Sequence, residues 1–430
     1  MNTKQFLYVA ILLGIFCLPA CRKTCQFDTT YRLPGEWEEQ TSVWMGWAVY
    51  ENQAGMPTQS VHAEMIKALT PHVIVDLAVQ DSAEIATATA ELLGYGLTQD
   101  VINTKIRFHK IRHNDIWWRD MGGVFLKSEV DKQRIVDFNF NGWGYAPYTD
   151  AVGQMGFALD ETVDRQIAAE LNLSTVASSM ILEGGAIEAN GKGTILVAES
   201  VVFQRNPNLS KAAAEAELMR VLQAKKVIWL PRGVGNDVHS VEGSPFLIDG
   251  EKVYTAITTS GHTDEFVRFI DEHTILLAEV PLSEATDTIA RFSRQALLAA
   301  EAVLKNATDQ DGKPFNIVRM PETGTILKEV TAGDGTFDFL STISALQIDP
   351  NAPIKVVLAS SYLNYVLSNG VILMPKYAGN QSTTDLQAKD AQALQIMQGL
   401  FPQHQIVQIS VNNINIGGGG MHCITQQVPK

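Results

Sequence analysis

The fold and the chemistry of this chain are decided by a stretch near its C-terminus, Gly417-Gly418-Gly419-Gly420-Met421-His422-Cys423. Glycine tolerates positive φ and lets the backbone approach other groups closely, so four glycines beside a thiol can place its sulfur at the wall of a cleft. A flexible C-terminal linker is the alternative. The run contains no Ser or Pro, and the β-favouring residues at 415–416 and 424–425 predict an ordered strand instead.

A reactive thiol needs a base or a cationic neighbour to hold it as thiolate. His422 is adjacent in sequence, but successive side chains of an extended strand point to opposite faces. We therefore expect the partner of Cys423 to come from a distant segment. The competing interpretation is a buried, inert cysteine.

Length and charge narrow the classes of protein. The chain has 430 residues, of which 46% are hydrophobic, so it can bury a large core. Its 33 basic and 47 acidic residues give a net charge of −14. That balance argues against nucleic acid or an anionic membrane surface as partner and is compatible with a cationic ligand. The motifs G-x-G-x-x-G, G-x-x-x-x-G-K-[ST], G-x-S-x-G and H-E-x-x-H are absent.

The first 20 residues predict a signal peptide, with Lys4 followed by an apolar run at 6–16. Leu18-Pro19-Ala20-Cys21 resembles the lipobox of bacterial lipoproteins, which implies cleavage before Cys21 and acylation of its sulfur. We expect residues 21–30 to be a tether and the protein to sit in a bacterial cell envelope through this lipid anchor alone. A plain secretory signal is the alternative. Cys25 and Cys423 remain in the exported chain and make no disulfide framework.

Residues 31–430 predict alternating strands and helices, and hence one compact α/β domain. The expected helices are 61–69, 82–93, 283–305, 384–400 and one that is capped by Ser210 and buries Ala214, Leu218, Val221 and Leu222. The expected strands are 72–79, 226–230, 274–279, 354–359, 371–374 and 405–410.

The segment 114–123 combines two indoles with charges and ends in glycines. Trp117 and Asp120 could form an aromatic wall and a carboxylate for a cation with an apolar stem. Alternatively, Arg119 and Asp120 simply pair with each other.

Two further stretches carry candidate polar groups. Glu183 directly precedes Gly184-Gly185, a pattern that by itself also fits a strand ending in a turn. In 260–266, strand alternation would put His262 and Asp264 on one face, as an acid/base beside a substrate-binding carboxylate or as a solvated strand edge. Two residues are too few for a metal site.

Together these groups suit attack on a guanidinium, which carboxylates bind bidentately. Thiolate attack gives a tetrahedral adduct, the histidine protonates departing ammonia, and it then activates water to release a ureido product. This chemistry requires no metal or organic cofactor. The expected partner is a small cationic guanidino substrate; the oligomeric state is left open.

The chain resembles the family of agmatine deiminases and bacterial peptidylarginine deiminases, which belongs to the guanidine-modifying pentein superfamily. The resemblance covers nearly all of 31–430 and rests on the stretches PGEWE (34–38), WWRDMGG (117–123), FNGWG (140–144), LEGG (182–185), RNPNLS (205–210), GHTD (261–264), the segment 364–375 and GGGGMHCITQQ (417–427). It implies a pentein fold, a five-bladed α/β propeller with pseudo-fivefold symmetry and a central active site.

The same resemblance implies roles for individual residues. Cys423 is similar to the family's nucleophile, and His262 to its general acid/base. Asp120 and Asp264 match the carboxylates that bind the guanidinium. Glu183 matches the acid that orients the histidine, and Trp117 an aromatic residue that lines the substrate stem.

The substrate's tail stays open at this point. Deimination of agmatine to N-carbamoylputrescine and ammonia is the first expectation, but Met121-Gly122-Gly123, the insert at 231–260 and the GHTDEF wording depart from agmatine-type members. Deimination of peptidyl-arginine to citrulline is the alternative. A non-catalytic binding protein for cationic solutes and a cysteine peptidase fit the ring of acids less well.

Overall fold

The computed structural model describes residues 30–47, 58–130, 132–242 and 246–430. The expected signal peptide, Cys21, Cys25 and all of the tether except Thr30 lie outside these residues. Among the helices of the described ranges, none is both long and apolar enough to cross a bilayer.

Five of the sheets formed by these residues repeat one pattern, in which a central strand has an antiparallel partner on one side and a parallel partner on the other. The central strands are β2 (Gln40–Gly46), β6 (Gln133–Asn139), β9 (Thr194–Ala198), β14 (Thr274–Glu279) and β19 (Val371–Lys376). The antiparallel partners are β21 (Gln426–Pro429), β5 (Val124–Ser128), β8 (Glu188–Ala189), β13 (Val267–Phe269) and β18 (Val366–Ser368). The parallel partners are β3 (Ile74–Val79), β7 (Ser174–Ile181), β10 (Lys226–Leu230), β15 (Asn316–Pro321) and β20 (Gln405–Ser410).

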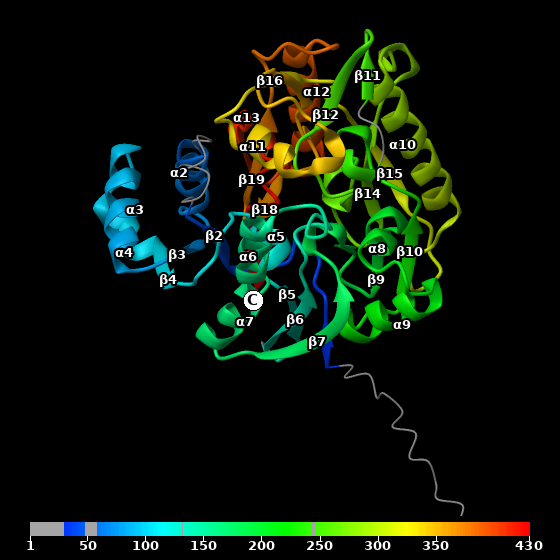
Figure 1. Cartoon of the computed structure of the whole chain (residues 1–430). Coiled ribbons are helices and arrows are strands. Elements are labelled where there is room, and N and C mark those ends of the chain that lie inside the picture. Colours follow the sequence, from blue (N-terminus) through cyan, green and yellow to red (C-terminus); the bar gives the residue numbers. More distant parts are fainter. Residues whose placement is uncertain (1–29, 48–57, 131, 243–245) are drawn as a thin grey trace, which may run out of the picture.

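Each central strand reaches its parallel neighbour through helices, because parallel strands need a crossover connection. The crossover helices are α2 (Gln59–Leu69), α6 (Ala151–Asp160) with α7 (Val163–Glu170), α8 (Glu199–Arg205) with α9 (Lys211–Leu222), α10 (Thr288–Asn306) and α12 (Leu386–Leu400). Figure 1 shows α9 and α10 on the outside of the molecule, with the strands further in. The fivefold repeat implied by the resemblance is thus confirmed.

The remaining elements extend this plan. Two of the five sheets gain an edge strand. β1 (Tyr31–Arg32) joins the sheet of β6, and β4 (Ile106–Lys110) joins the sheet of β2. The chain passes through α3 (Ser82–Gly94) and α4 (Gln99–Lys105) between β3 and β4. The insert at 231–260 supplies β11 (Phe246–Ile248) and β12 (Glu251–Thr255) to a sixth sheet with β16 (Leu327–Val330) and β17 (Ile354–Val357), near α11 (Gly335–Thr342).

The two ends of the described chain close the ring. β21 pairs antiparallel with β2, and Trp44 lies opposite Gln426. Because only residues 424 and 425 separate Cys423 from β21, this pairing fixes where the thiol lies relative to the first blade.

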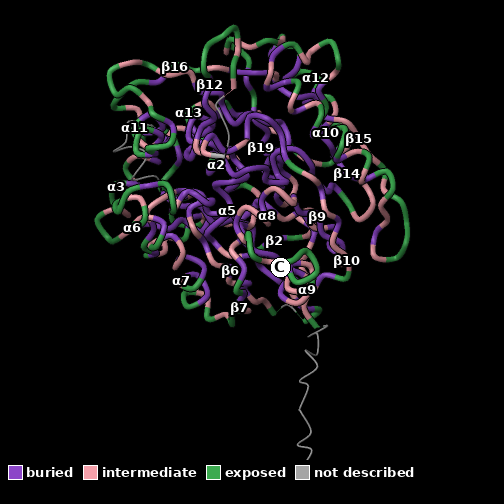
Figure 2. The backbone as a smooth tube through the Cα atoms, turned by 45° about the vertical axis from the view of Figure 1, so that its right-hand side comes forward, coloured by how far each residue is buried: buried purple, intermediate pink, exposed green. Residues whose placement is uncertain are grey.

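Several predicted elements match the structure. The strands at 226–230, 274–279 and 405–410 have the bounds that the sequence predicted. Ser210 caps α9 by accepting from the backbone N–H of Ala213, and all four residues of its predicted apolar face are buried. Figure 2 shows the buried backbone gathered in the middle of the molecule and the exposed segments at its rim.

The predicted start of one helix and one predicted strand are wrong. The helix expected at 283–305 begins at Thr288, because Asp287 caps it by accepting from Ala290 N–H, while Ser283 belongs to a short 3₁₀ turn, Leu282–Glu284. No strand forms at 424–425, since the chain is turning there through the bond from Thr425 N–H to the carbonyl of His422.

The cap of α9 gives a stability prediction. Ser210→Ala removes the side-chain acceptor for Ala213 N–H, so the free energy of unfolding should fall by about 1 kcal/mol. Chemical denaturation measures this, with Ser210→Asp as the control that retains an acceptor. An alanine variant as stable as the parent would show that the cap contributes nothing.

Candidate active site

The five candidate reactive residues meet in the buried middle of the ring. Their exposed fractions are 0% for Glu183, His262 and Asp264, 4% for Cys423 and 8% for Asp120. Each stands next to a strand or short helix that fixes the backbone locally: α5 (Trp118–Met121), the 3₁₀ turns Gly184–Ala186 and Thr263–Glu265, and β21. The structure therefore brings together every catalytic side chain that the sequence singled out.

Two glycines leave the room in which these side chains converge. A Cβ on Gly185 would lie 2.6 Å from Nδ1 of His262, 2.9 Å from Oδ1 of Asp120 and 3.2 Å from Oδ2 of Asp264. A Cβ on Gly419 would lie 2.6 Å from the Trp117 ring and 3.1 Å from Sγ of Cys423. The glycines of both motifs thus serve close approach, as proposed for the C-terminal run.

His262 is held by an ion-paired acid. Its Nε2 lies 3.1 Å from Oε2 of Glu183, whose Oε1 accepts from Nε of Arg205 at 2.8 Å. Burial alone would raise the pKa of Glu183, but Arg205 and His262 outweigh it and hold that pKa at about 2. Burial alone would lower the pKa of His262, but the charges of Asp120 and Glu183 raise it to about 9. At neutral pH this histidine is therefore a cation.

The way in which His262 and Asp264 come together differs from the expectation. They do not alternate along a strand, because Ser260 and Gly261 have φ of 70° and 117° and the 3₁₀ turn Thr263–Glu265 follows. Both side chains nevertheless reach the site. Nδ1 of His262 lies 3.7 Å from Oδ1 of Asp120 and has no hydrogen-bond partner among the described residues, so it can bind a ligand.

The two acids suited to a guanidinium are firmly oriented. Asp120 accepts from Gly185 N–H at 3.0 Å and from Nε1 of Trp143 at 2.7 Å. Burial, with the charges of Glu183 and Asp264, raises the pKa of Asp120 to about 6. Oδ1 of Asp264 is buried and finds no hydrogen-bond partner in the part of the chain that the structure describes. A planar cation placed between these carboxylates would satisfy both.

Cys423 lies among acceptors. Its Sγ is 3.7 Å from Oδ2 of Asp264 and 3.8 Å from Oε1 of Glu265, and it accepts from Nδ2 of Asn364 at 3.1 Å. Burial, and then the charges of Asp264, Glu265 and Asp120, raise the pKa of the thiol well above its usual value. The thiol therefore keeps its proton until a positive group enters the site.

The sequence predicted that His422 would not be the partner of the thiol, and the structure agrees. The reason differs, because residue 422 does not lie in a strand. Nδ1 of His422 lies 2.7 Å from Oδ2 of Asp264, and Nε2 lies 2.7 Å from Oε1 of Glu36. Each ring nitrogen of His422 thus faces a carboxylate oxygen. Although burial opposes it, His422 keeps the pKa of Asp264 below its usual value, so this acid stays ionised.

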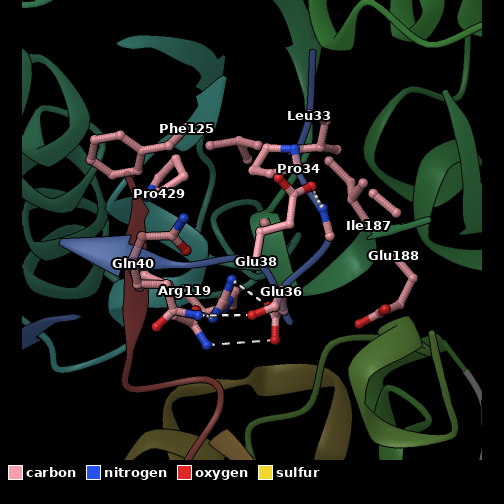
Figure 3. A pocket seen from close by; sticks show the side chains of 16 residues that line it. Leu33, Pro34, Glu36, Glu38, Gln40, Arg119, Phe125, Ile187, Glu188 and Pro429 are labelled. Carbon is pink, nitrogen blue, oxygen red and sulfur yellow. Dashed lines mark hydrogen bonds and ion pairs between the residues drawn. The ribbon is translucent and has the colours of Figure 1, made fainter. Parts of the chain in front are cut away.

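A small cavity, called the rear cavity below, borders Glu36, the second partner of this histidine. It has a volume of about 70 Å³ and is lined by Glu36, Arg119, Glu188 and Gln426 among others (Figure 3). NH1 of Arg119 pairs with Oε1 of Glu36 at 3.0 Å, so the alternative in which Arg119 pairs with Asp120 is wrong. Glu36 thereby joins the rear cavity to the His422–Asp264 pair.

Sequence reasoning missed several residues that shape the site. Asp237 accepts from the backbone N–H groups of Gly261 and His262, both at 2.9 Å, and so positions the histidine. Asp237 lies inside the insert at 231–260, where no sequence motif indicated a functional residue. Asn364 and Arg205 stand in quoted stretches of the family resemblance, which was the only signal available for them.

Donor atoms of Asp264, Glu265 and Cys423 all lie within 4.8 Å of one another. All three side chains already have partners in the protein, since Asp264 binds His422 and Asn364 donates to both Glu265 and Cys423. Oδ1 of Asp120 and Nδ1 of His262 converge on the same region as Oδ2 of Asp264, around Gly185.

The ring of five α/β blades defines the class, a pentein-type α/β propeller, and a buried thiol, imidazole and carboxylates meet at its centre. The family model described as "Porphyromonas-type peptidyl-arginine deiminase" matches residues 32–243 and 246–429. The chain belongs to this family.

Individual relatives agree with this assignment. The chain is 30% identical to an agmatine deiminase of Pseudomonas savastanoi over 93% of this chain and 95% of that protein. It is 28% identical to an agmatine deiminase of Medicago truncatula over 93% of this chain and 96% of that protein. It is also similar to the solved agmatine deiminase of Enterococcus faecalis, with a TM-score of 0.72 and 25% identity over 93% of this chain and 96% of the other.

The charge state of His262 can be measured. Its titration midpoint in histidine NMR should lie near pH 9. Glu183→Gln removes a negative charge that contacts the ring, so the midpoint should drop by at least one pH unit. Spectra of His262→Asn identify the signal. An unchanged midpoint in Glu183→Gln would contradict the ion pair.

Proposed function

We propose that this protein is a hydrolase of linear amidines that deiminates a guanidino group, with agmatine as its first candidate substrate and N-carbamoylputrescine and ammonia as products. The observation that carries this proposal is the convergence of Cys423, His262 and three carboxylates on one buried space. That set matches the needs of a planar cation with a poorly electrophilic carbon.

Binding comes first. Asp120 and Asp264 accept hydrogen bonds from the guanidinium N–H groups and hold the substrate as the full cation. Trp117, which lies against the glycines beside Cys423, lines the path of the apolar stem. The positive charge lowers the pKa of the neighbouring thiol, because an opposite charge within a few ångströms favours the ionised form.

Carbon–nitrogen cleavage follows. The Cys423 thiolate forms an S–C bond to the guanidinium carbon and gives a tetrahedral adduct. His262, a cation at neutral pH, donates its proton to the departing nitrogen, the C–N bond breaks, and ammonia leaves. A thiouronium intermediate remains bound through sulfur.

Hydrolysis completes the cycle. His262, now neutral, takes a proton from water, whose oxygen bonds to the same carbon. The C–S bond then breaks and the hydroxyl proton of the adduct passes to the released ammonia, giving ammonium; this releases the ureido product and restores the thiolate. Glu183 keeps the ring oriented for both proton transfers.

Two features bear on the substrate's tail. The relatives named above are agmatine deiminases, and the reactive side chains are almost completely buried, which suits a slender small molecule. Peptidyl-arginine is the second candidate, supported by the description of the family model and by the GHTDEF stretch.

A substrate panel separates these candidates. Ammonia release is measured with agmatine, free arginine and an arginine-containing peptide, and we expect agmatine to be turned over fastest.

Cys423→Ala should lower kcat by at least about 10³-fold on the best substrate, because the nucleophile is lost. Unchanged thermal unfolding of the variant is the control. Full activity in Cys423→Ala would refute the mechanism.

We also propose that the protein is exported and anchored in the bacterial cell envelope by lipid on Cys21, with residues 1–20 removed. The basis is the sequence alone: a short apolar run followed by Leu18-Pro19-Ala20-Cys21.

This anchor is tested by fractionation. The full-length chain should partition with membranes and incorporate labelled fatty acid, whereas Cys21→Ser should lose the label and become extractable without detergent. Cys25→Ser is the matched control and should behave like the parent. Equal labelling of both variants would exclude Cys21 as the acceptor.

A further inference from the structure

The deimination scheme leaves one proton unassigned. Cys423 carries a proton in the resting site, and it must lose that proton before sulfur can attack. His262 cannot take it, since its pKa of about 9 means that the ring is already protonated at neutral pH. The thiol needs another acceptor within contact.

Two carboxylate oxygens lie next to the sulfur. Oδ2 of Asp264 is 3.7 Å away and Oε1 of Glu265 is 3.8 Å away. Asp264 is a poor proton acceptor, because the same Oδ2 already accepts a charge-assisted bond from His422 and is needed to bind the substrate. Glu265 has no cationic partner among the described residues.

We propose that Glu265 is a further catalytic residue, the base that removes the proton of Cys423. The S–H bond breaks as an O–H bond forms on Oε1 of Glu265, and the thiolate attacks the guanidinium carbon. When the C–S bond breaks at the end of the cycle, the same proton returns to sulfur. No other reactant is needed. This inference rests on the proposed deimination.

The local geometry keeps acid and thiol together. Nδ2 of Asn364 donates to Oε1 of Glu265 at 2.9 Å and to Sγ of Cys423 at 3.1 Å. The main chain of Glu265 is fixed as well, since its carbonyl accepts from the hydroxyl of Ser361 at 2.6 Å. With an exposed fraction of 3%, Glu265 is shielded from bulk water as a competing proton source.

The charges around Glu265 support its role. The titratable groups that influence it are Asp264, Asp237, Glu322, Cys423 and Tyr377. Burial and the first three of these raise the pKa of Glu265 well above its usual value. In its ionised form Glu265 is therefore a stronger base than Asp264, whose pKa is lowered.

The test is Glu265→Gln, which keeps an oxygen to accept from Asn364 but cannot take a proton. At pH 7 we expect kcat to fall by about 100-fold or more, with KM changed less than about threefold, because Asp120 and Asp264 still bind the cation. The deficit should shrink as the pH rises, since the bound substrate cation lowers the pKa of the thiol and a growing fraction of it then ionises without Glu265.

The matched control is Glu322→Gln. Glu322 is also buried, with a pKa raised by burial to about 8, and no hydrogen bond joins it to Cys423 in the described part of the chain. Because its charge affects Glu265 less than those of Asp264 and Asp237 do, this variant should keep kcat within about twofold. A kcat of Glu265→Gln within about threefold of the parent at pH 7 would overturn the proposal. A deficit that does not change with pH would overturn it too, because it would indicate a structural defect and not the loss of a base.

A second measurement is independent of turnover. Alkylation of Cys423 by iodoacetamide, followed against pH without substrate, reports the apparent pKa of the thiol. If Glu265 is ionised at rest, its replacement by Gln removes a negative charge and lowers that pKa by at least one unit; no shift would mean that Glu265 is already protonated and cannot act as the base. If the parent enzyme deiminates no guanidine at all, the proposed function fails, whatever the alkylation profile shows.

Discussion

The concentration of negative charge in a dry space is the constraint on which this structure depends. Glu183, Asp120, Asp264 and Glu265 are all nearly inaccessible to water, and burying an unpaired carboxylate costs several kcal/mol. Arg205 compensates Glu183, and His422 compensates Asp264. Asp120 lies 3.7 Å from the cationic ring of His262, whereas Glu265 pairs with no cation among the described residues. The site is therefore short of one positive charge, which a guanidinium substrate supplies.

The fold makes this arrangement possible by closing a ring of blades through its two ends. Pairing of β21 with β2 joins the last residues of the chain to the first blade. The segment before β21 carries His422 and Cys423 into the middle, where they meet groups from the second, third and fourth blades. Glycines at 185 and 419 are essential to this meeting, since any side chain there would occupy the space of the reacting groups.

The charges also divide the work between two proton sites. One ion-paired unit, Glu183 with His262, holds a proton on the ring at neutral pH, which the proposed mechanism gives to the leaving nitrogen. Another, Asp264 with His422 and Glu36, holds a carboxylate ionised for substrate binding and reaches the rear cavity. Arg119 and Arg268 both pair with Glu36, so this acid stays ionised too. The thiol lies between these units and remains neutral until the substrate changes the local charge.

The sequence by itself determined much of this. Hydrophobic periodicity predicted several strands and the buried face of α9, because local patterns fix those elements. Residue types alone identified Cys423, His262, Glu183, Asp120 and Asp264. Only the tertiary structure decided that His262 and Asp264 reach the site from a 3₁₀ turn, that Arg119 pairs with Glu36, and that Asp237, Asn364 and Glu265 belong to the site. These contacts join residues far apart in the chain, and no local pattern encodes which distant charge a buried group will meet.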